Sequence, residues 1–182
     1  MRELPVLRPV HWPTDSTALG TIDNSFVTDR IYRVHRDVLA FRLAIATVDP
    51  PVRKSYGSLL TNIEHVRQMR HVVVADQDGR LVGVVAADRS EWNRRVQIEH
   101  LYVVPEWRGR GVGRALVDSI VGFARDVGSW CVWLETQNTN YPAIQFYLRY
   151  GFRLCGLDER LYDPSTQPSE ETALFFSFDL AM

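Results

Sequence analysis

Residues 96–115, VQIEHLYVVPEWRGRGVGRA, decide the fold expected for this chain. The first half is rich in apolar, β-favouring residues and predicts a strand. Pro105 ends that strand, because proline has no N–H to offer a neighbouring strand. A glycine-rich run then leads into residues 112–127, whose apolar side chains recur at helical spacing. Strand, glycine loop and helix in this order direct backbone N–H groups and the positive end of a helix dipole at an anion, so the stretch predicts a phosphate-binding loop.

The glycines of this loop do not match the two commonest phosphate-binding patterns. A P-loop needs GxxxxGK[ST], and the dinucleotide fingerprint GxGxxG fails from either Gly109 or Gly111. The pattern that fits is Arg-x-x-Gly-x-Gly, at Arg108, Gly111 and Gly113, and it resembles the pyrophosphate loop of the GNAT superfamily of N-acetyltransferases. The alternative is an ordinary glycine-rich turn with surface arginines.

The resemblance to GNAT enzymes implies acetyl-CoA as co-substrate and no metal. It implies an oxyanion held by backbone amides at the end of the strand. The residues that it implies for the coenzyme are Val103, Val104, Arg108, Gly109, Arg110, Gly111, Val112, Gly113 and Arg114.

Composition limits the other classes of protein. The chain has 182 residues, 46% of them hydrophobic and 24% charged, which predicts one domain with a sizeable core. A net charge of −1 argues against a nucleic-acid partner, and no apolar run is long enough to predict a membrane span. Cys131 and Cys155 lie in apolar runs, which predicts buried free thiols and a cytoplasmic protein. No histidine, cysteine and aspartate cluster has metal-ligand spacing; a homodimer is left open.

The order of predicted elements indicates an α/β (α+β) domain over residues 1–182, with a central mixed β-sheet flanked by helices. Two strands, 31–35 and 38–48, are expected first, the second half-buried and ended by Asp49-Pro50-Pro51. A short helix up to about residue 70, with Thr61 as its N-cap, precedes a hairpin of 71–76 and 80–88. Strand 129–136 follows the central helix and should run parallel to 96–104. A helix at 142–150, strands at 152–158 and 172–180, and a loop at 163–171 complete the GNAT order, with the acetyl-CoA motif at about 96–128 and a second motif at about 129–157.

The second motif lies on the helix at 142–150. Asn140 is a plausible N-cap, and Gly151 should end the helix. The Asn-x-x-Ala…Tyr…Gly-Phe pattern is similar to the second GNAT motif, which implies that Asn140, Ala143 and Phe146 line the coenzyme. The same resemblance implies that Tyr147 is the general acid for the leaving thiolate. A phenol is protonated at neutral pH, so it can donate; a core aromatic, or coenzyme contact without proton transfer, is the alternative.

The acceptor amine must lose a proton before it can attack, and a carboxylate in an apolar strand could take that proton. Glu99, on the central strand, is the first candidate, and Glu135, on the neighbouring strand, is the second. His100 should point to the opposite face from Glu99, because strand residues alternate. The alternative for Glu99 is a surface position or an ion pair with Arg94, Arg95 or Arg153.

A closer resemblance covers nearly the whole chain. The segments IDNSFVTD, VDPP, VWLETQN, CGLDERLYD and ETALFFSF resemble the streptothricin (nourseothricin) acetyltransferases, which acetylate the β-lysine amine of a cationic antibiotic. The expected acceptor is therefore a small-molecule amine of that kind, with Trp92, Glu135 and Tyr162 as candidate substrate-binding residues. One segment differs: those enzymes are acidic where this chain has the basic stretch 51–70. A protein N-terminus, a polyamine, an aminoglycoside, or mere acyl-CoA binding without catalysis are the alternatives.

Overall fold

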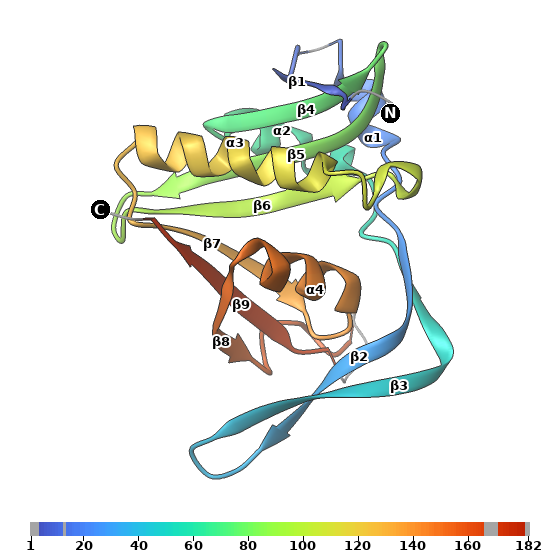
Figure 1. Cartoon of the computed structure of the whole chain (residues 1–182), viewed down its shortest axis with the longest axis vertical. Coiled ribbons are helices and arrows are strands. Elements are labelled where there is room, and N and C mark those ends of the chain that lie inside the picture. Colours follow the sequence, from blue (N-terminus) through green and yellow to red (C-terminus); the bar gives the residue numbers. More distant parts are fainter. Residues whose placement is uncertain (1–3, 13, 166–170, 181–182) are drawn as a thin grey trace. The chain divides into compact units, whose positions relative to one another are not determined.

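The computed structural model describes residues 4–12, 14–165 and 171–180, and Figure 1 labels its elements. Its contacts divide the chain into two compact units that alternate along the sequence. The first unit takes the described residues of Met1–Ser25, Ser55–Trp133 and Asp179–Met182; the second takes those of Phe26–Lys54 and Leu134–Phe178. Part of the loop expected at 163–171, residues 166–170, lies outside the described residues.

Four antiparallel strands form the sheet of the first unit. Their order is β1 (Val6–Pro9), β4 (His71–Gln77), β5 (Arg80–Ser90) and β6 (Arg95–Val103). Strand β1 was not predicted from the sequence. The predicted hairpin joins β4 to β5: Asp78 and Gly79 have φ values of 52° and 84°, the left-handed conformation that an Asp-Gly turn requires. β5 is buried from Leu81 to Ala87, as a central strand should be.

Helices cover both faces of these strands (Figure 1). Helix α3 (Val112–Asp126) lies on one face, and α1 (Ser16–Gly20) and α2 (Ile63–Gln68) lie on the other. The buried stripe of α3 includes Leu116, and a Cβ built on Gly83 of β5 would come within 3.1 Å of the Leu116 side chain, so helix and strand pack closely. Thr61 is not the N-cap predicted for α2. A 3-10 turn, η1 (Leu59–Asn62), precedes α2, and its cap is Ser58, whose side chain accepts a hydrogen bond from the Leu60 N–H.

The second unit is built on β7, β8 and β9. Strand β7 (Cys131–Gln137) begins in the first unit and continues in the second, where the order is β7, β9 (Ala173–Asp179), β8 (Arg153–Asp158). All these strands belong to one seven-stranded sheet, in the order β1-β4-β5-β6-β7-β9-β8. Because α3 crosses from β6 to β7, those two strands run parallel and the sheet is mixed, as predicted.

Helix α4 (Tyr141–Tyr150) has the ends that the sequence predicted. The Asn140 side chain accepts a hydrogen bond from the Ala143 N–H at 3.2 Å, and Gly151 ends the helix with a φ of 121°. The helix packs through aromatic rings. Tyr147 lies 5.6 Å from Phe152 and 6.3 Å from Phe176, measured between ring centroids.

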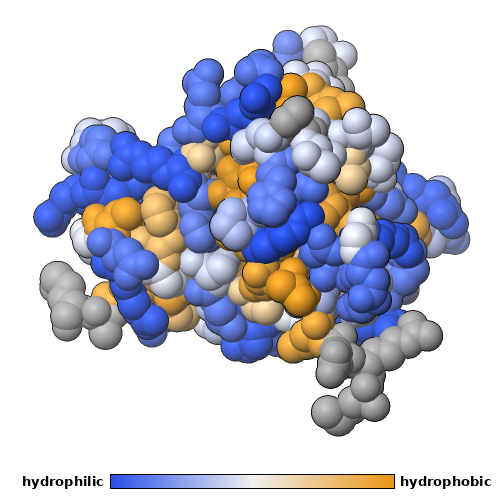
Figure 2. Space-filling model, turned by 90° about the horizontal axis from the view of Figure 1, so that it is seen from above, coloured by the Kyte–Doolittle hydropathy of each residue, from blue (hydrophilic) through white to orange (hydrophobic). Residues whose placement is uncertain are grey.

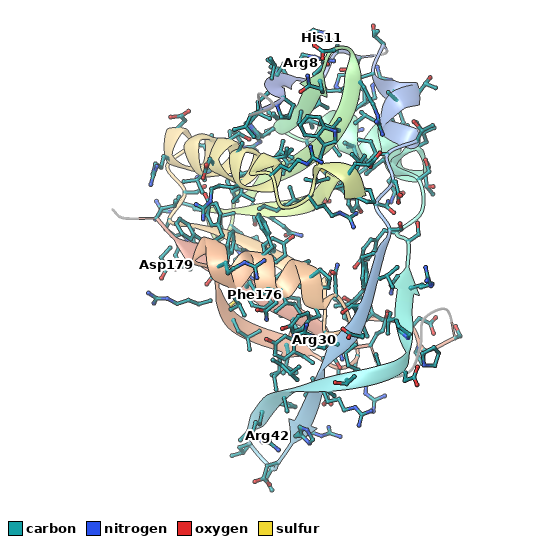
Figure 3. The ribbon with its side chains drawn as sticks, turned by 45° about the vertical axis from the view of Figure 1, so that its right-hand side comes forward. Arg8, His11, Arg30, Arg42, Phe176 and Asp179 are labelled. Carbon is teal, nitrogen blue, oxygen red and sulfur yellow. The ribbon has the colours of Figure 1, made fainter. Side chains whose placement is uncertain are left out.

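A separate two-stranded sheet, β2 (Phe26–Arg36) and β3 (Phe41–Lys54), completes the second unit (Figure 1). The prediction that the prolines end β3 is wrong. The strand continues to Lys54, because Pro50 and Pro51 fall where the register is irregular and no ladder hydrogen bond is needed from them. The predicted start of this strand, at residue 38, is also too early. Leu39 lies in the connecting turn and is 98% exposed. Figure 3 labels Arg30 along this hairpin and Arg42 near its far end.

The surface is largely polar, with apolar patches between the polar side chains on the face drawn in Figure 2. Cys131 is buried as expected, but Cys155 is exposed, because it lies on the edge strand β8. Among the described residues, no group of three potential metal ligands is gathered. No helix in that part of the chain is long and apolar enough to cross a membrane.

Candidate active site

The predicted phosphate loop connects β6 to α3. A short 3-10 turn, η2 (Pro105–Trp107), follows the strand, and Gly109 and Gly111 then take φ values of 71° and 91°. A Cβ on Gly109 would meet no atom within 4 Å, so the space beside it is open. Gly111 is the N-cap of α3 and has no side chain to satisfy the first N–H groups of that helix. These groups and the helix dipole therefore remain available to an anion, and the loop fits a pyrophosphate.

Two arginines of the loop have different surroundings. The Nε of Arg108 donates to the Val103 carbonyl at 2.8 Å, which anchors the guanidinium to the end of β6. Partial burial lowers the pKa of Arg108, and the carboxylates of Asp23 and Glu106 act in the opposite direction. The Arg110 guanidinium lies 5.4 Å from the centre of the Trp107 ring. Both cations are thus held beside the open helix end, where an anion would need them.

The end of β6 presents one candidate oxyanion donor rather than two. The Val104 N–H donates to the Val82 carbonyl at 3.0 Å, so it does not have the role that the sequence analysis gave it. Val103 pairs with Gly83 in the next position along the strands. Hydrogen-bonded and non-hydrogen-bonded pairs alternate in an antiparallel ladder, and the pair of Val104 and Val82 is hydrogen-bonded, so the pair of Val103 and Gly83 is non-hydrogen-bonded. In such a pair the N–H points away from the partner strand. The Val103 amide is therefore directed away from β5, as an oxyanion donor must be.

Glu99 occupies a β-bulge in β6. Ala86 pairs with His100 and Ala87 pairs with Ile98, so Glu99 is the extra residue between them. Adjacent residues Ala86 and Ala87 face opposite sides of the sheet, and so must Ile98 and His100. The bulge breaks the alternation from which His100 and Glu99 were predicted to face opposite sides, so that prediction loses its basis.

A histidine of α2 holds the Glu99 carboxylate. His65 Nε2 lies 2.8 Å from Glu99 Oε2, and the two side chains are 61% and 27% exposed. The structure therefore replaces the arginine partners considered for Glu99 with an imidazole. Burial lowers the pKa of His100, the Glu99 carboxylate raises it, and His65 lowers it.

Two tyrosines extend this cluster. Burial raises the pKa of the Tyr102 phenol, whose oxygen lies 3.4 Å from His100 Nδ1. Tyr56 stacks on Tyr102 with ring centroids 6.2 Å apart. The Glu99 carboxylate is thus bordered by imidazole and phenol groups. These groups can form hydrogen bonds that orient a polar acceptor, and they carry no negative charge that would bind a cationic acceptor in place of Glu99.

Trp92 is far from this cluster. It lies in the turn between β5 and β6, 87% exposed, whereas the phosphate loop follows the other end of β6. A strand advances about 3.3 Å per residue, so the nine residues of β6 separate the two ends by roughly 30 Å. The structure does not bring Trp92 to the predicted coenzyme loop.

In the second unit, Tyr147 and Phe146 lie on α4 with Asn140 and Ala143 at its start. Tyr147 is 7% exposed and packs among rings, including Phe146 at 5.4 Å between centroids. Asn140 is also buried, and its side chain caps the helix through the bond to Ala143. These positions are compatible with the predicted coenzyme contacts, and the proton-donor role of Tyr147 stays a prediction.

Glu135 and Tyr162, both predicted to bind substrate, are brought together. The Tyr162 hydroxyl donates to Glu135 Oε1. Burial raises the pKa of the Glu135 carboxyl, while the Tyr162 hydrogen bond and Lys54 lower it and Glu171 raises it. Lys54 itself is bound by Glu171, with Nζ 2.6 Å from both carboxylate oxygens. Glu135 is therefore a half-buried acid that accepts a hydrogen bond from a neutral hydroxyl.

The geometry defines a protein that binds a phosphorylated ligand: a strand with a bulged carboxylate ends in a glycine loop over a helix N-terminus. Residues 40–152 match the model of the acetyltransferase (GNAT) family. The chain belongs to this family, and it is an acetyl-CoA-dependent N-acetyltransferase, as predicted.

Its relatives include enzymes with a named substrate. A streptothricin acetyltransferase of Streptomyces lavendulae is 37% identical over 172 residues, covering 91% of this chain and 90% of that protein. A streptothricin acetyltransferase of Escherichia coli is 32% identical over 154 residues, covering 85% of each. The crystal structure of a nourseothricin acetyltransferase has a TM-score of 0.86 at 40% identity and covers 97% of this chain and 98% of that one.

Sequence reasoning missed His65, Tyr56 and Tyr102. His65 is 34 positions from Glu99, and no local pattern connects a histidine on a short helix with a carboxylate on a later strand. The available signal was weak: α2 was predicted in about the right place, and a helix beside a sheet will present some of its side chains to the strands.

Proposed function

We propose that the protein transfers the acetyl group of acetyl-CoA to an amino group of streptothricin or a closely similar cationic antibiotic. The observation that carries this proposal is the similarity to streptothricin acetyltransferases, which extends over 91% of the chain and 90% of the Streptomyces lavendulae protein. A likeness confined to the coenzyme motif would support acetyl transfer alone. This one extends over nearly the whole length of both chains.

The donor half of the reaction is assigned to the first unit. The open N–H groups at the start of α3, with Arg108 and Arg110, hold the pyrophosphate. Acetyl-CoA supplies a thioester carbonyl, and the Val103 amide binds the negative charge that develops on its oxygen. Val104 is left out of this role because its N–H is bonded to Val82.

Proton transfer needs one base and one acid. Glu99 takes the proton from the acceptor ammonium, which frees the nitrogen lone pair to attack the carbonyl carbon. The C–N bond forms, the C–S bond breaks, and the thiolate receives a proton. Tyr147 is the proposed donor of that proton, since a phenol is protonated at neutral pH.

A cationic acceptor also needs a counter-charge. We assign this role to Glu135, whose carboxylate accepts a hydrogen bond from the neutral Tyr162 hydroxyl. The basic stretch 51–70 should repel a cationic substrate less strongly than its sequence suggests. Arg67 pairs with Glu64, and Arg70 pairs with Glu91, so much of its charge is neutralised locally.

The test is release of free thiol from acetyl-CoA in the presence of streptothricin, with aminoglycosides, polyamines and peptides with free N-termini as the comparison panel. Streptothricin should have the highest kcat/KM and should gain one acetyl group by mass spectrometry. A higher kcat/KM for another amine would replace the proposed substrate. Coenzyme binding without thiol release for any amine would make the protein a binding module.

A further inference from the structure

One more functional group lies beside the proposed base. His65 projects from α2 onto the bulge of β6 and lies 2.8 Å from Glu99. A surface histidine and a surface glutamate could meet by chance, but this pair joins two different elements at the one residue that departs from the strand register. The bulge places the carboxylate on the α2 side of the sheet, where the imidazole lies.

We propose that His65 is a positioning residue that fixes the Glu99 carboxylate and passes the proton collected by Glu99 to solvent. This inference rests on the proposed function only through the role of Glu99 as base. The two exposures agree with it: Glu99 is 27% exposed, whereas His65 is 61% exposed. The carboxylate is sheltered enough to act on a bound amine, and the imidazole reaches water.

The proton route balances at each step. The acceptor ammonium gives its proton to Glu99 and becomes a neutral amine. The resulting carboxylic acid gives the proton to His65 Nε2, and the imidazole, now cationic, releases a proton from Nδ1 to water. Glu99 is then ionised again, and the neutral imidazole is left with its proton on Nε2. Exchange of protons with water returns the imidazole to the Nδ1–H tautomer, which leaves Nε2 free to accept the next proton.

The groups around this pair favour His65 over the neighbouring histidine as the exit. His100 and Tyr102 face it from β6, and Tyr56 stacks on Tyr102. Burial lowers the pKa of His100, so His100 is a poorer acceptor for a proton than an imidazole in water would be. On α2, Glu64 pairs with Arg67, which leaves the local charge on that helix balanced.

The experiment is a double-mutant cycle on steady-state kinetics. His65→Gln should lower kcat about tenfold, less than the about 10²- to 10⁴-fold expected for loss of a general base, and should change KM for acetyl-CoA less than twofold. In a Glu99→Gln background, His65→Gln should have no further effect, because the proton it handles is no longer collected. Free imidazole should restore part of the rate of His65→Ala. His35→Ala, a histidine exposed on the β2–β3 hairpin, is the matched control and should neither lose rate nor respond to imidazole.

Several outcomes would overturn the proposal. Independent, multiplicative losses in the cycle would show that His65 does not act through Glu99. Loss confined to the melting temperature or to KM for acetyl-CoA would make His65 a structural residue. If wild-type protein acetylates streptothricin and Glu99→Gln is slow while His65→Gln is normal, this inference fails and the proposed function stands.

Discussion

Two carboxylates of the molecule, one in each unit, were both candidates for the base and have different surroundings. Glu99 is the extra residue of a bulge, partly open to solvent, and its partner is an imidazole that can accept a proton. Glu135 is half-buried on a regular strand, and its partner is a phenol that donates a hydrogen bond to it. A base must take up and release a proton in each turnover. A carboxylate that binds a cationic substrate must instead stay in one position and stay charged. The difference in partners assigns the first task to Glu99 and the second to Glu135.

The largest expected effect tests the base. Glu99→Gln should lower kcat about 10²- to 10⁴-fold with little change in KM for acetyl-CoA, because an amide cannot take the proton. Part of the loss should be recovered at high pH, where more of the acceptor amine is already neutral. Steady-state kinetics across pH measures both effects. Glu64→Gln is the matched control: it removes a carboxylate that is 76% exposed on α2, and its kcat should stay within twofold.

The next effect concerns binding rather than chemistry. Glu135→Gln should raise KM for streptothricin about 10- to 100-fold, the range of one charge-assisted hydrogen bond, while kcat changes less than fivefold. The same variant should keep its KM for acetyl-CoA. Kinetics with varied acceptor measures this. If instead kcat collapses and Glu99→Gln is nearly normal, the two roles assigned above must be exchanged.

A smaller effect sharpens the comparison by removing only the partner of Glu135. Tyr162→Phe keeps the ring and loses the hydroxyl that donates to the carboxylate. We expect KM for streptothricin to rise about 2- to 10-fold, the scale of a neutral hydrogen bond, with kcat unchanged. An unchanged acceptor KM would show that the hydroxyl does not orient Glu135 for the substrate.

Local signals in the sequence were enough for much of the fold. The Asp-Gly turn between β4 and β5, the loop into α3, and the Asn140 and Gly151 ends of α4 each depend on residues within a few positions of one another. Such features follow from backbone preferences and capping, so a sequence shows them directly.

The features that the sequence did not show depend on pairing between distant residues. The bulge at Glu99 exists only in the register of β6 against β5, and it removes the regular alternation from which the direction of His100 was predicted. The bond of Val104 to Val82 and the exposure of Cys155 on an edge strand have the same origin. The coenzyme loop was therefore predictable, whereas the surroundings of the base required the structure.

The smallest expected effect separates the two carboxylates by stability. Burial raises the pKa of the Glu135 carboxyl above 4.5, so the folded protein binds this proton more tightly than the unfolded chain does. The free energy of unfolding must then fall as the pH rises from 4.5 through the raised value, because the charged form is costly to keep buried. Glutamine is neutral at every pH and its amide oxygen can still accept from Tyr162. Glu135→Gln should therefore be more stable than the parent at neutral pH and should have a higher Tm.

That gain should disappear as the pH falls below 4.5, where the carboxyl of the parent is protonated in both states. Thermal melts of parent, Glu135→Gln and the exposed control Glu64→Gln at several pH values measure the difference, and the control should stay within about 0.5 kcal/mol throughout. A destabilised Glu135→Gln at neutral pH would mean that the ionised carboxylate is a net stabilising group, held by Lys54 and Tyr162. Glu135 would then be part of the scaffold, and the counter-charge for the antibiotic would have to come from another residue.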